Sequence, residues 1–194
     1  MDIYYLSSYT ILKQLKNSKA GILDGSIEGN EKKTLGFEER SISIKIALIA
    51  ITAALYTALG YIFQPISFMV FQFRVAEVIV GICILFPIEG LIGNVLGVFF
   101  VNLTSPLGYI DLFSCVVNIP ALYCIVIFRD KRFLKYLGGL LYAIIISIYV
   151  AIILNIVWTL PIILNFFYVL VPEIILATLG IILFDLIKKR FKID

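Results

Sequence analysis

The feature that most constrains this chain is a series of long apolar runs that begins near Ile44 and has only short breaks. A helix that crosses a bilayer needs about 20 mostly apolar residues, and several of the runs reach that length. Only 15% of the residues are charged, whereas soluble domains average about 25%. A chain of 194 residues, 61% of them hydrophobic, has too little interior to bury this surface, so lipid must cover part of it. We therefore predict an all-α integral membrane protein.

The apolar runs divide into six predicted helices. The first and the last three are long enough to span a bilayer, but the second and third are short and are separated by Pro87 and Gly90. These two could alternatively form one broken segment, which would reverse the side of every later loop. The predicted helices cover residues 44–63, 74–87, 89–104, 109–128, 134–157 and 162–187.

The distribution of basic residues chooses between these topologies, because cytoplasmic loops carry an excess of Lys and Arg. With six spans and a cytoplasmic N-terminus, 15 of the 16 basic residues lie on the cytoplasmic side, and Arg74 is the exception. We therefore expect a multi-pass protein of the cell membrane with both termini in the cytoplasm. Its parts would be a flexible polar tail (1–43), a six-helix transmembrane domain (44–187) and a basic C-terminus (188–194).

Several catalytic and metal-binding patterns are absent from the sequence. There is no His, which is the commonest metal ligand and general base. Cys83, Cys115 and Cys124 form no C-x-x-C pair, so we expect them to act as small buried hydrophobic residues. No G-x-x-x-x-G-K-[ST] phosphate loop is present. We expect no enzyme activity, no cofactor or metal, and no nucleic-acid partner.

Ionisable and amide side chains lie in or near the predicted spans, mostly in the half away from the cytoplasm. An ionisable group at the centre of a span costs about 2.5–3.5 kcal/mol on insertion scales, so such groups usually face a partner or a cavity. Because these residues come from five helices at similar depth, we interpret them as one convergent pocket. The candidate binding residues are Arg74, Glu77, Asn102, Asp111, Asn155 and Glu173.

The simpler alternative is that these groups only satisfy one another, with Arg74 pairing with Glu77 on one helix and the amides joining helices. One cation cannot neutralise three carboxylates, however, and an unpaired buried carboxylate must take up a proton or find a cationic partner. We therefore expect a solute with several N–H donors or a positive charge. Glu89, in the turn beside Pro87, is instead expected to be solvated.

The first predicted helix carries a second signal, a face of small residues. Ala50, Ala54 and Ala58 recur every four residues, and Ala53 and Gly60 broaden the face. Small residues let helices approach closely. An internal helix contact is the default interpretation, and contact with a different subunit is the alternative.

The segment Phe71-Gln-Phe-Arg-Val-Ala-Glu77 resembles the signature that follows the first helix in the QueT family. These proteins are small substrate-binding S components of energy-coupling-factor (ECF) transporters. The resemblance covers about residues 44–187 and leaves the N-terminal tail outside it. It continues through Ile92-Gly-Asn-Val-Leu-Gly97, Asn102, Gly108-Tyr-Ile-Asp111 and Asn165-Phe-Phe-Tyr-Val-Leu-Val-Pro-Glu173. Pro172 departs from the small residue expected before the Glu.

The resemblance implies a six-helix ECF S-component-like bundle. It implies that the alanine face docks onto a transmembrane coupling subunit, which carries two ATPase subunits. The implied substrate is a 7-deazaguanine precursor of queuosine, such as 7-aminomethyl-7-deazaguanine. The implied roles begin with the carboxylates: Glu77 or Glu173 would bind the guanine edge, and Asp111 would bind the amine. Asn102 and Asn155 would bind other ligand atoms, and Tyr168 or a Phe of residues 65–73 would stack on the base. Arg74 would orient Glu77.

Two other functions remain open at this stage. One is a stand-alone proton-coupled carrier, in which the carboxylates form a proton relay. The other is an S component for a different cationic, vitamin-like solute. Uptake by this chain alone and a panel of binding measurements would distinguish them.

Overall fold

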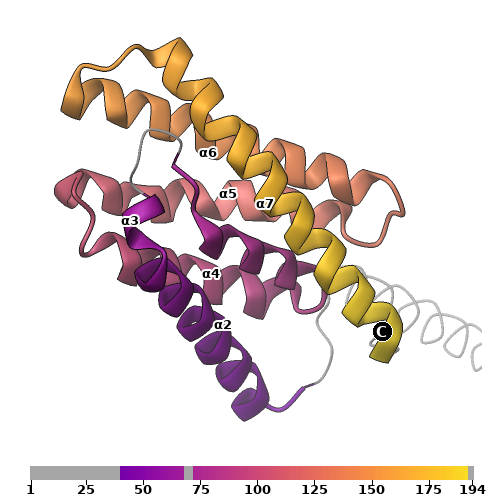
Figure 1. Ribbon diagram of the computed structural model, residues 1–194. Helices are drawn as coiled ribbons and strands as arrows, with labels where there is room; N and C mark the ends of the chain where they lie inside the picture. The colour runs from indigo at the N-terminus through magenta and orange to yellow at the C-terminus, as the bar shows by residue number, and fades with distance from the viewer. Residues whose placement is uncertain (1–39, 68–71, 192–194) are drawn as a thin grey trace, which may run out of the picture. The chain divides into compact units, whose positions relative to one another are not determined.

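The computed structural model describes residues 40–67 and 72–191, and every regular element in this part of the chain is a helix (Figure 1). The predicted N-terminal tail lies almost entirely outside the described residues. The elements are α2 (Ile42–Ile62), the short α3 (Gln64–Ser67), the 3-10 helix η1 (Val75–Ile84), α4 (Pro87–Asn102), the 3-10 helix η2 (Gly108–Phe113), α5 (Ser114–Phe128), α6 (Leu134–Trp158) and α7 (Ile162–Phe191).

Four helical segments among the described residues are long and apolar enough to cross a membrane. They are Ile42–Ile62, Gly108–Phe128, Leu134–Trp158 and Ile162–Phe191. η1 and α4 are shorter, with 10 and 16 residues. The 3-10 form compensates in part for the shortness of η1, because it rises about 2.0 Å per residue where an α-helix rises about 1.5 Å.

η1 and α4 form an antiparallel hairpin that reverses at Pro87. Pro87 occupies the first turn of α4, where its missing N–H leaves no helical bond unmade. Gly90 lies against Cys83, and further along α4 the Asn94 amide is 3.5 Å from the carbonyl oxygen of Ile79. The second and third predicted helices are therefore two separate elements, as expected, and not one broken segment.

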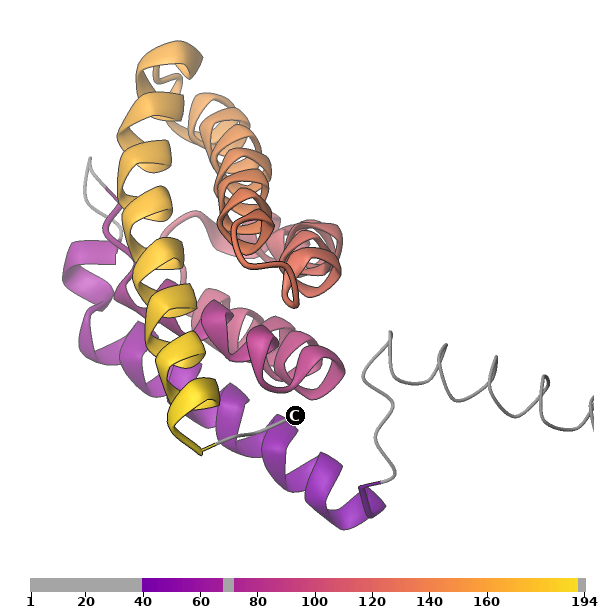
Figure 2. The same ribbon diagram turned by 90° about the vertical axis from the view of Figure 1, so that its right-hand side faces the viewer.

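η1 lies within the bundle and contacts α2, α4, α5 and α7. Its closest neighbour is α7, where a Cβ added to Gly81 would lie 2.2 Å from the backbone of Gly180. Two glycines at this crossing let the two backbones approach closely, so the middle of η1 lies directly against α7. Figure 2 shows α6 and α7 packed side by side.

The packing of α2 corrects one expectation. Its inward residues contact glycines of α4: an added Cβ on Gly93 would meet Thr52, and one on Gly97 would meet Tyr56. Ala53 is buried on this inward face, whereas Ala50, Ala54 and Ala58 are all exposed. The default interpretation of an internal contact at these three alanines was wrong, because they face away from the bundle.

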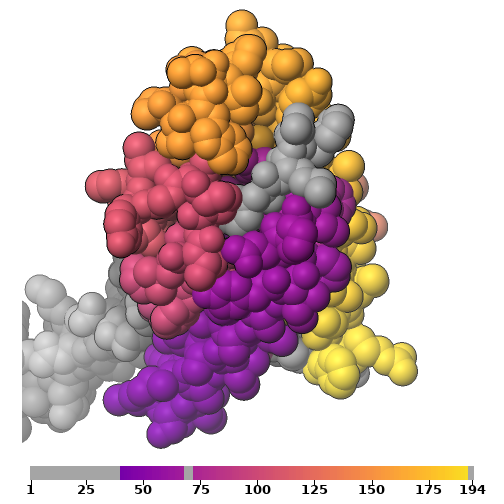
Figure 3. Space-filling view, turned by 60° about the vertical axis from the view of Figure 1, so that its left-hand side comes forward, coloured from indigo at the N-terminus to yellow at the C-terminus, as the bar shows by residue number. Residues whose placement is uncertain are grey.

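The outer face of α2 lies open in Figure 3, where α2 is indigo to purple. It forms an apolar groove of about 710 Å³ together with Leu96 and Phe100 of α4. The α2 residues that line this groove are Ile46, Ile49, Ala50, Ala53, Ala54, Thr57, Ala58 and Tyr61. We call this surface the alanine groove.

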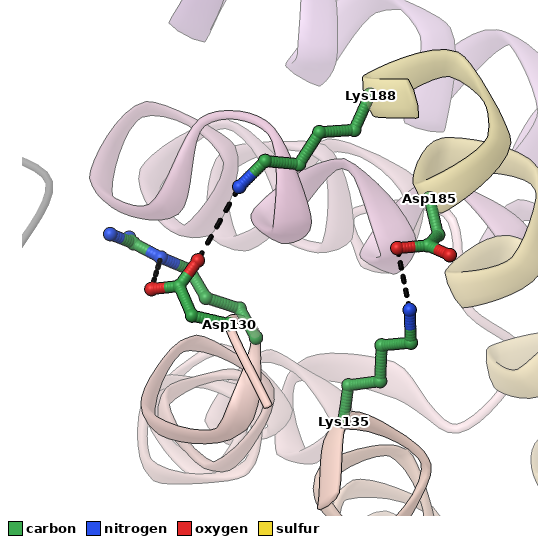
Figure 4. A network of polar contacts seen from close by, with 5 residues as sticks. Asp130, Lys135, Asp185 and Lys188 are labelled. Carbon is green, nitrogen blue, oxygen red and sulfur yellow. Dashed lines mark hydrogen bonds and ion pairs between the residues drawn. The ribbon is translucent and has the colours of Figure 1, made fainter. Parts of the chain in front are cut away.

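Basic residues gather at one end of the bundle (Figure 4). Lys135 at the start of α6 lies 2.5 Å from Asp185 near the end of α7. Lys188 of α7 lies 3.4 Å from Asp130, which follows α5. At the start of α2, Arg40 stacks over the ring of Phe86 in the η1–α4 turn. This region, the basic end, therefore collects the start of α2, the hairpin turn, the α5–α6 loop and the end of α7.

Glu89 differs from expectation at this end. It is buried, and its Oε2 atom has no hydrogen-bond partner among the described residues. The expectation of a solvated side chain was wrong. Glu89 lies in the first turn of α4, at the N-terminal end of that helix.

Candidate functional site

The first predicted binding residue along the helices is Glu77. It lies in the first turn of η1, and the basic end of the bundle lies at the opposite end of this helix. Its carboxylate is buried and accepts two hydrogen bonds from tyrosines. The hydroxyl of Tyr56 on α2 donates to Oε1 at 2.7 Å, and that of Tyr142 on α6 donates to Oε2. Tyr142 also lies 3.3 Å from Oδ1 of Asn118 on α5. Glu77 therefore joins η1 to α2 and α6, and both of its oxygens are occupied.

Glu173 on α7 is the second buried carboxylate. Its side chain is 0% exposed, and neither oxygen has a hydrogen-bond partner in the described part of the chain. Its charge lies within electrostatic range of Glu77 and Arg74. Leaving a carboxylate in this state costs free energy, because burial removes its water and nothing replaces it.

Arg74 immediately precedes η1 and is buried. Its guanidinium lies within electrostatic range of Asp111, Glu173 and Glu77. One cation thus faces three carboxylates, as the sequence predicts. The formal charge of this group of four side chains is −2 when all are ionised.

Asp111 lies in η2 and is buried. The hydroxyl of Ser105 donates to its Oδ2 at 2.6 Å, whereas Oδ1 has no partner among the described residues. The Asn102 amide at the end of α4 donates to the backbone carbonyl of Asp111 at 3.1 Å and to Ser114 Oγ at 2.6 Å. Asn102 therefore holds the α4–η2 connection against the start of α5.

Asn155 and Tyr168 lie on the last two helices, α6 and α7. The Asn155 amide donates to the carbonyl oxygen of Leu160 at 2.8 Å, which closes the connection between α6 and α7. Tyr168 is half-buried on α7, five residues before Glu173. The structure thus brings Glu77, Asp111 and Glu173 within electrostatic range of Arg74 and adds Asn102 beside Asp111.

Sequence reasoning missed Tyr56 and Tyr142, the two donors that hold Glu77. The chain contains 11 tyrosines, so residue type alone did not single them out. The available signal was spacing, because Tyr56 follows Thr52 and precedes Gly60 at intervals of four on the buried face of α2. For Tyr142 in an apolar helix, no comparable signal exists.

The side chains of the site are packed closely together. The cavity lined by Tyr56, Arg74, Asn102 and their neighbours has a volume of about 10 Å³, room for about one water molecule. Ligand pockets usually measure about 300–1,000 Å³. This cavity is therefore too small for a solute of purine size.

Comparison with known proteins gives one match. Residues 46–189 match the family described as QueT transporter, which confirms the resemblance inferred from the sequence. No curated protein matches the chain, and no solved structure does. The matched region runs from the first turns of α2 almost to the end of α7 and includes every candidate site residue. The chain therefore belongs to the QueT transporter family.

Proposed function

We infer that this membrane transport protein is the substrate-binding S component of an ECF-type importer and that it binds a 7-deazaguanine precursor of queuosine. The observation that carries this inference is the group of Glu77, Asp111 and Glu173 around Arg74, the one cation that the described residues place among them. Buried carboxylates in excess of cations favour a ligand that brings N–H donors or a positive charge. 7-Aminomethyl-7-deazaguanine has both, since its guanine edge carries N–H groups and its aminomethyl group is a cation.

In this proposal the binding residues are Arg74, Glu77, Asn102, Asp111, Asn155, Tyr168 and Glu173. The small volume of the cavity beside Tyr56, Arg74 and Asn102 would require neighbouring helices to separate before a purine-sized solute could enter there. Such opening and closing steps are common in proteins that enclose small ligands. Tyr168 would stack on the base once the site has opened.

We further infer six membrane passes, with the basic end in the cytoplasm. The hairpin of η1 and α4 supports this, because its turn lies beside Arg40 and the other basic residues. A test uses single cysteines in a variant without the native ones. Tyr109→Cys, 87% exposed in the wild type, should react with a membrane-impermeant maleimide in intact cells, and Lys131→Cys should react only after the cells are opened. The reverse pattern would contradict this orientation.

The alanine groove would be the surface that contacts the coupling subunit. Its small side chains leave room for a helix of the partner to approach α2 closely. Ala54→Trp should abolish co-purification with the coupling and ATPase subunits while solute affinity changes less than about twofold. Ile148→Trp, at an exposed position of α6, is the control and should leave the complex intact. Loss of the complex in both variants would argue against a specific role of the groove.

The substrate is tested by calorimetric titration of the purified chain with 7-aminomethyl-7-deazaguanine, its 7-cyano analogue and guanine. We expect submicromolar binding of one deazaguanine, loss of that binding in Asp111→Asn, and unchanged binding in the matched control Asp130→Asn at the basic end. No heat with any of these ligands, from protein shown to be folded, would remove the queuosine assignment and favour another cationic solute. Uptake by this chain alone, abolished by an uncoupler, would favour a proton-coupled carrier.

A further inference from the structure

The three buried carboxylates of the site differ in how many hydrogen bonds they already accept. Glu77 accepts one on each oxygen, and Asp111 accepts one on Oδ2. Glu173 accepts none among the described residues, although it is as deeply buried as the other two. Glu173 is therefore the carboxylate with its full capacity to accept new donors.

Protonation does not by itself satisfy Glu173. A neutral carboxylic acid carries an O–H group that also needs an acceptor. Neither oxygen of Glu173 has a hydrogen-bond partner among the described residues. Arg74 contributes its charge from within electrostatic range, but no hydrogen bond reaches Glu173. The missing donors must come from outside the protein or from a rearranged site.

We propose that Glu173, and not Glu77, is the residue that reads the ligand's N–H edge. The two oxygens of a carboxylate can accept two parallel N–H groups, as they do in bidentate contacts with a guanidinium. Adjacent N–H groups of this kind occur on amidines and on aminopyrimidinone rings, including the guanine edge. Glu77, held by Tyr56 and Tyr142, is then a positioning residue that fixes the start of η1. This assignment rests on the proposed function and selects between the two roles that the sequence left open.

The experiment pairs a protein change with a ligand change. Calorimetry would compare 7-aminomethyl-7-deazaguanine with the analogue that lacks only the exocyclic 2-amino group. The wild type should prefer the amino ligand about ten- to hundredfold, the usual effect of a hydrogen bond to a charged group. In Glu173→Gln this preference should fall below about threefold. In Glu77→Gln both ligands should lose affinity by a similar factor, so that the preference remains.

A second arm needs no ligand. Glu173 makes no hydrogen bonds that a substitution would break, so thermal unfolding of Glu173→Gln should occur at the wild-type temperature or above it. Glu77→Gln replaces a charged acceptor of two tyrosine hydroxyls and should unfold several degrees lower. A clear loss of stability in Glu173→Gln would overturn the proposal by showing that the carboxylate has a structural partner.

The outcomes separate this proposal from the proposed function. If the amino preference persists in Glu173→Gln and disappears in Glu77→Gln, the deazaguanine assignment stands and the assignment of Glu173 is wrong. If the folded wild type binds neither ligand, the substrate assignment fails. The unfolding comparison then still decides whether Glu173 is the unsatisfied carboxylate of the site.

Discussion

The molecule contains two groups of charged side chains, and they differ in what satisfies them. At the basic end, Asp130 is 57% exposed and lies 3.0 Å from Arg129 and 3.4 Å from Lys188. In the candidate site, Glu173 is fully buried and accepts no hydrogen bond among the described residues. The contacts of Asp130 are explained by the protein and its solvent alone. The burial of Glu173 is not, and this difference identifies the candidate site more sharply than residue type does.

Burial alone does not make this distinction. The side chains of Lys135 and Asp185 at the basic end are only 6% and 14% exposed, yet they are paired at 2.5 Å. Asp185 also lies 2.8 Å from Lys189. This pair joins the start of α6 to the end of α7 and leaves little capacity for a ligand. Burial together with unused acceptor capacity on both oxygens distinguishes Glu173 from these paired carboxylates, whereas the buried Glu89 at the basic end lacks a partner on Oε2.

The largest effect on stability is expected from removing the one cation of the site. Arg74→Gln would leave Glu77, Asp111 and Glu173 without a compensating charge, which should cost about 3–5 kcal/mol. For a chain of this size the unfolding temperature should fall by about 10 °C. Thermal unfolding in detergent measures this fall in unfolding temperature. The double variant Arg74→Gln/Glu173→Gln should recover part of the lost stability. An unfolding temperature within about 2 °C of the wild type would show that the four side chains do not act as one charged group.

A smaller effect is expected at the paired cluster. Asp185→Asn would leave the buried Lys135 ammonium without its charged partner and should cost about 2–3 kcal/mol, less than at Arg74 because Asp185 is partly exposed. The double variant Lys135→Met/Asp185→Leu should unfold close to the wild-type temperature, since replacing a buried pair by apolar groups is often neutral. Calorimetric or fluorescence melting curves of the single and the double variant check both expected stabilities. If the double variant were as unstable as the single one, the pair would have a role beyond neutralising each other's charge.

The next effect concerns a single hydrogen bond inside the site. Tyr142→Phe keeps the buried ring but removes one of the two donors to Glu77, which should cost about 1.5 kcal/mol. Its matched control is Tyr109→Phe, at an exposed position where the hydroxyl reaches water. The melting temperature should fall in the first variant and stay unchanged in the second. Equal behaviour of the two would mean that the Tyr142 hydroxyl does not contribute to holding Glu77.

The comparison also shows what the sequence could predict. The positions of the six helical segments followed from hydrophobicity and length, and the family followed from local motifs. The sequence also predicted that Arg74 lies near three carboxylates, because ionisable groups are rare within apolar runs, and their role in binding stays a prediction. Glu77 differs from Glu173 in accepting hydrogen bonds from two tyrosines. These hydrogen bonds could not be predicted, since the tyrosines come from α2 and α6 and are distant in sequence.

The wrong expectation for α2 has a general physical cause. In a soluble protein, polarity marks the outward face of a helix, but lipid and protein interior are both apolar. The exposed Ala50, Ala54 and Ala58 and the buried Ala53 and Gly60 therefore look alike in the sequence. The inward face of α2 is determined by its packing on α4, where Thr52 lies against Gly93 and Tyr56 lies against Gly97. Pattern alone could not orient this helix.

The smallest effect is expected for the exposed pair at the basic end, and it is the sharpest control for the comparison. The Asp130 side chain is 57% exposed and that of Lys188 is 29% exposed, and the two are 3.4 Å apart. Water satisfies either partner when the other is removed, so Lys188→Gln should change stability by less than about 0.5 kcal/mol. Raising the salt concentration should weaken even this small contribution, because exposed charges are screened. Melting curves at low and high salt test it. A loss as large as that of Asp185→Asn would mean that the basic end acts as one cooperative network, and exposure would then no longer distinguish its pairs.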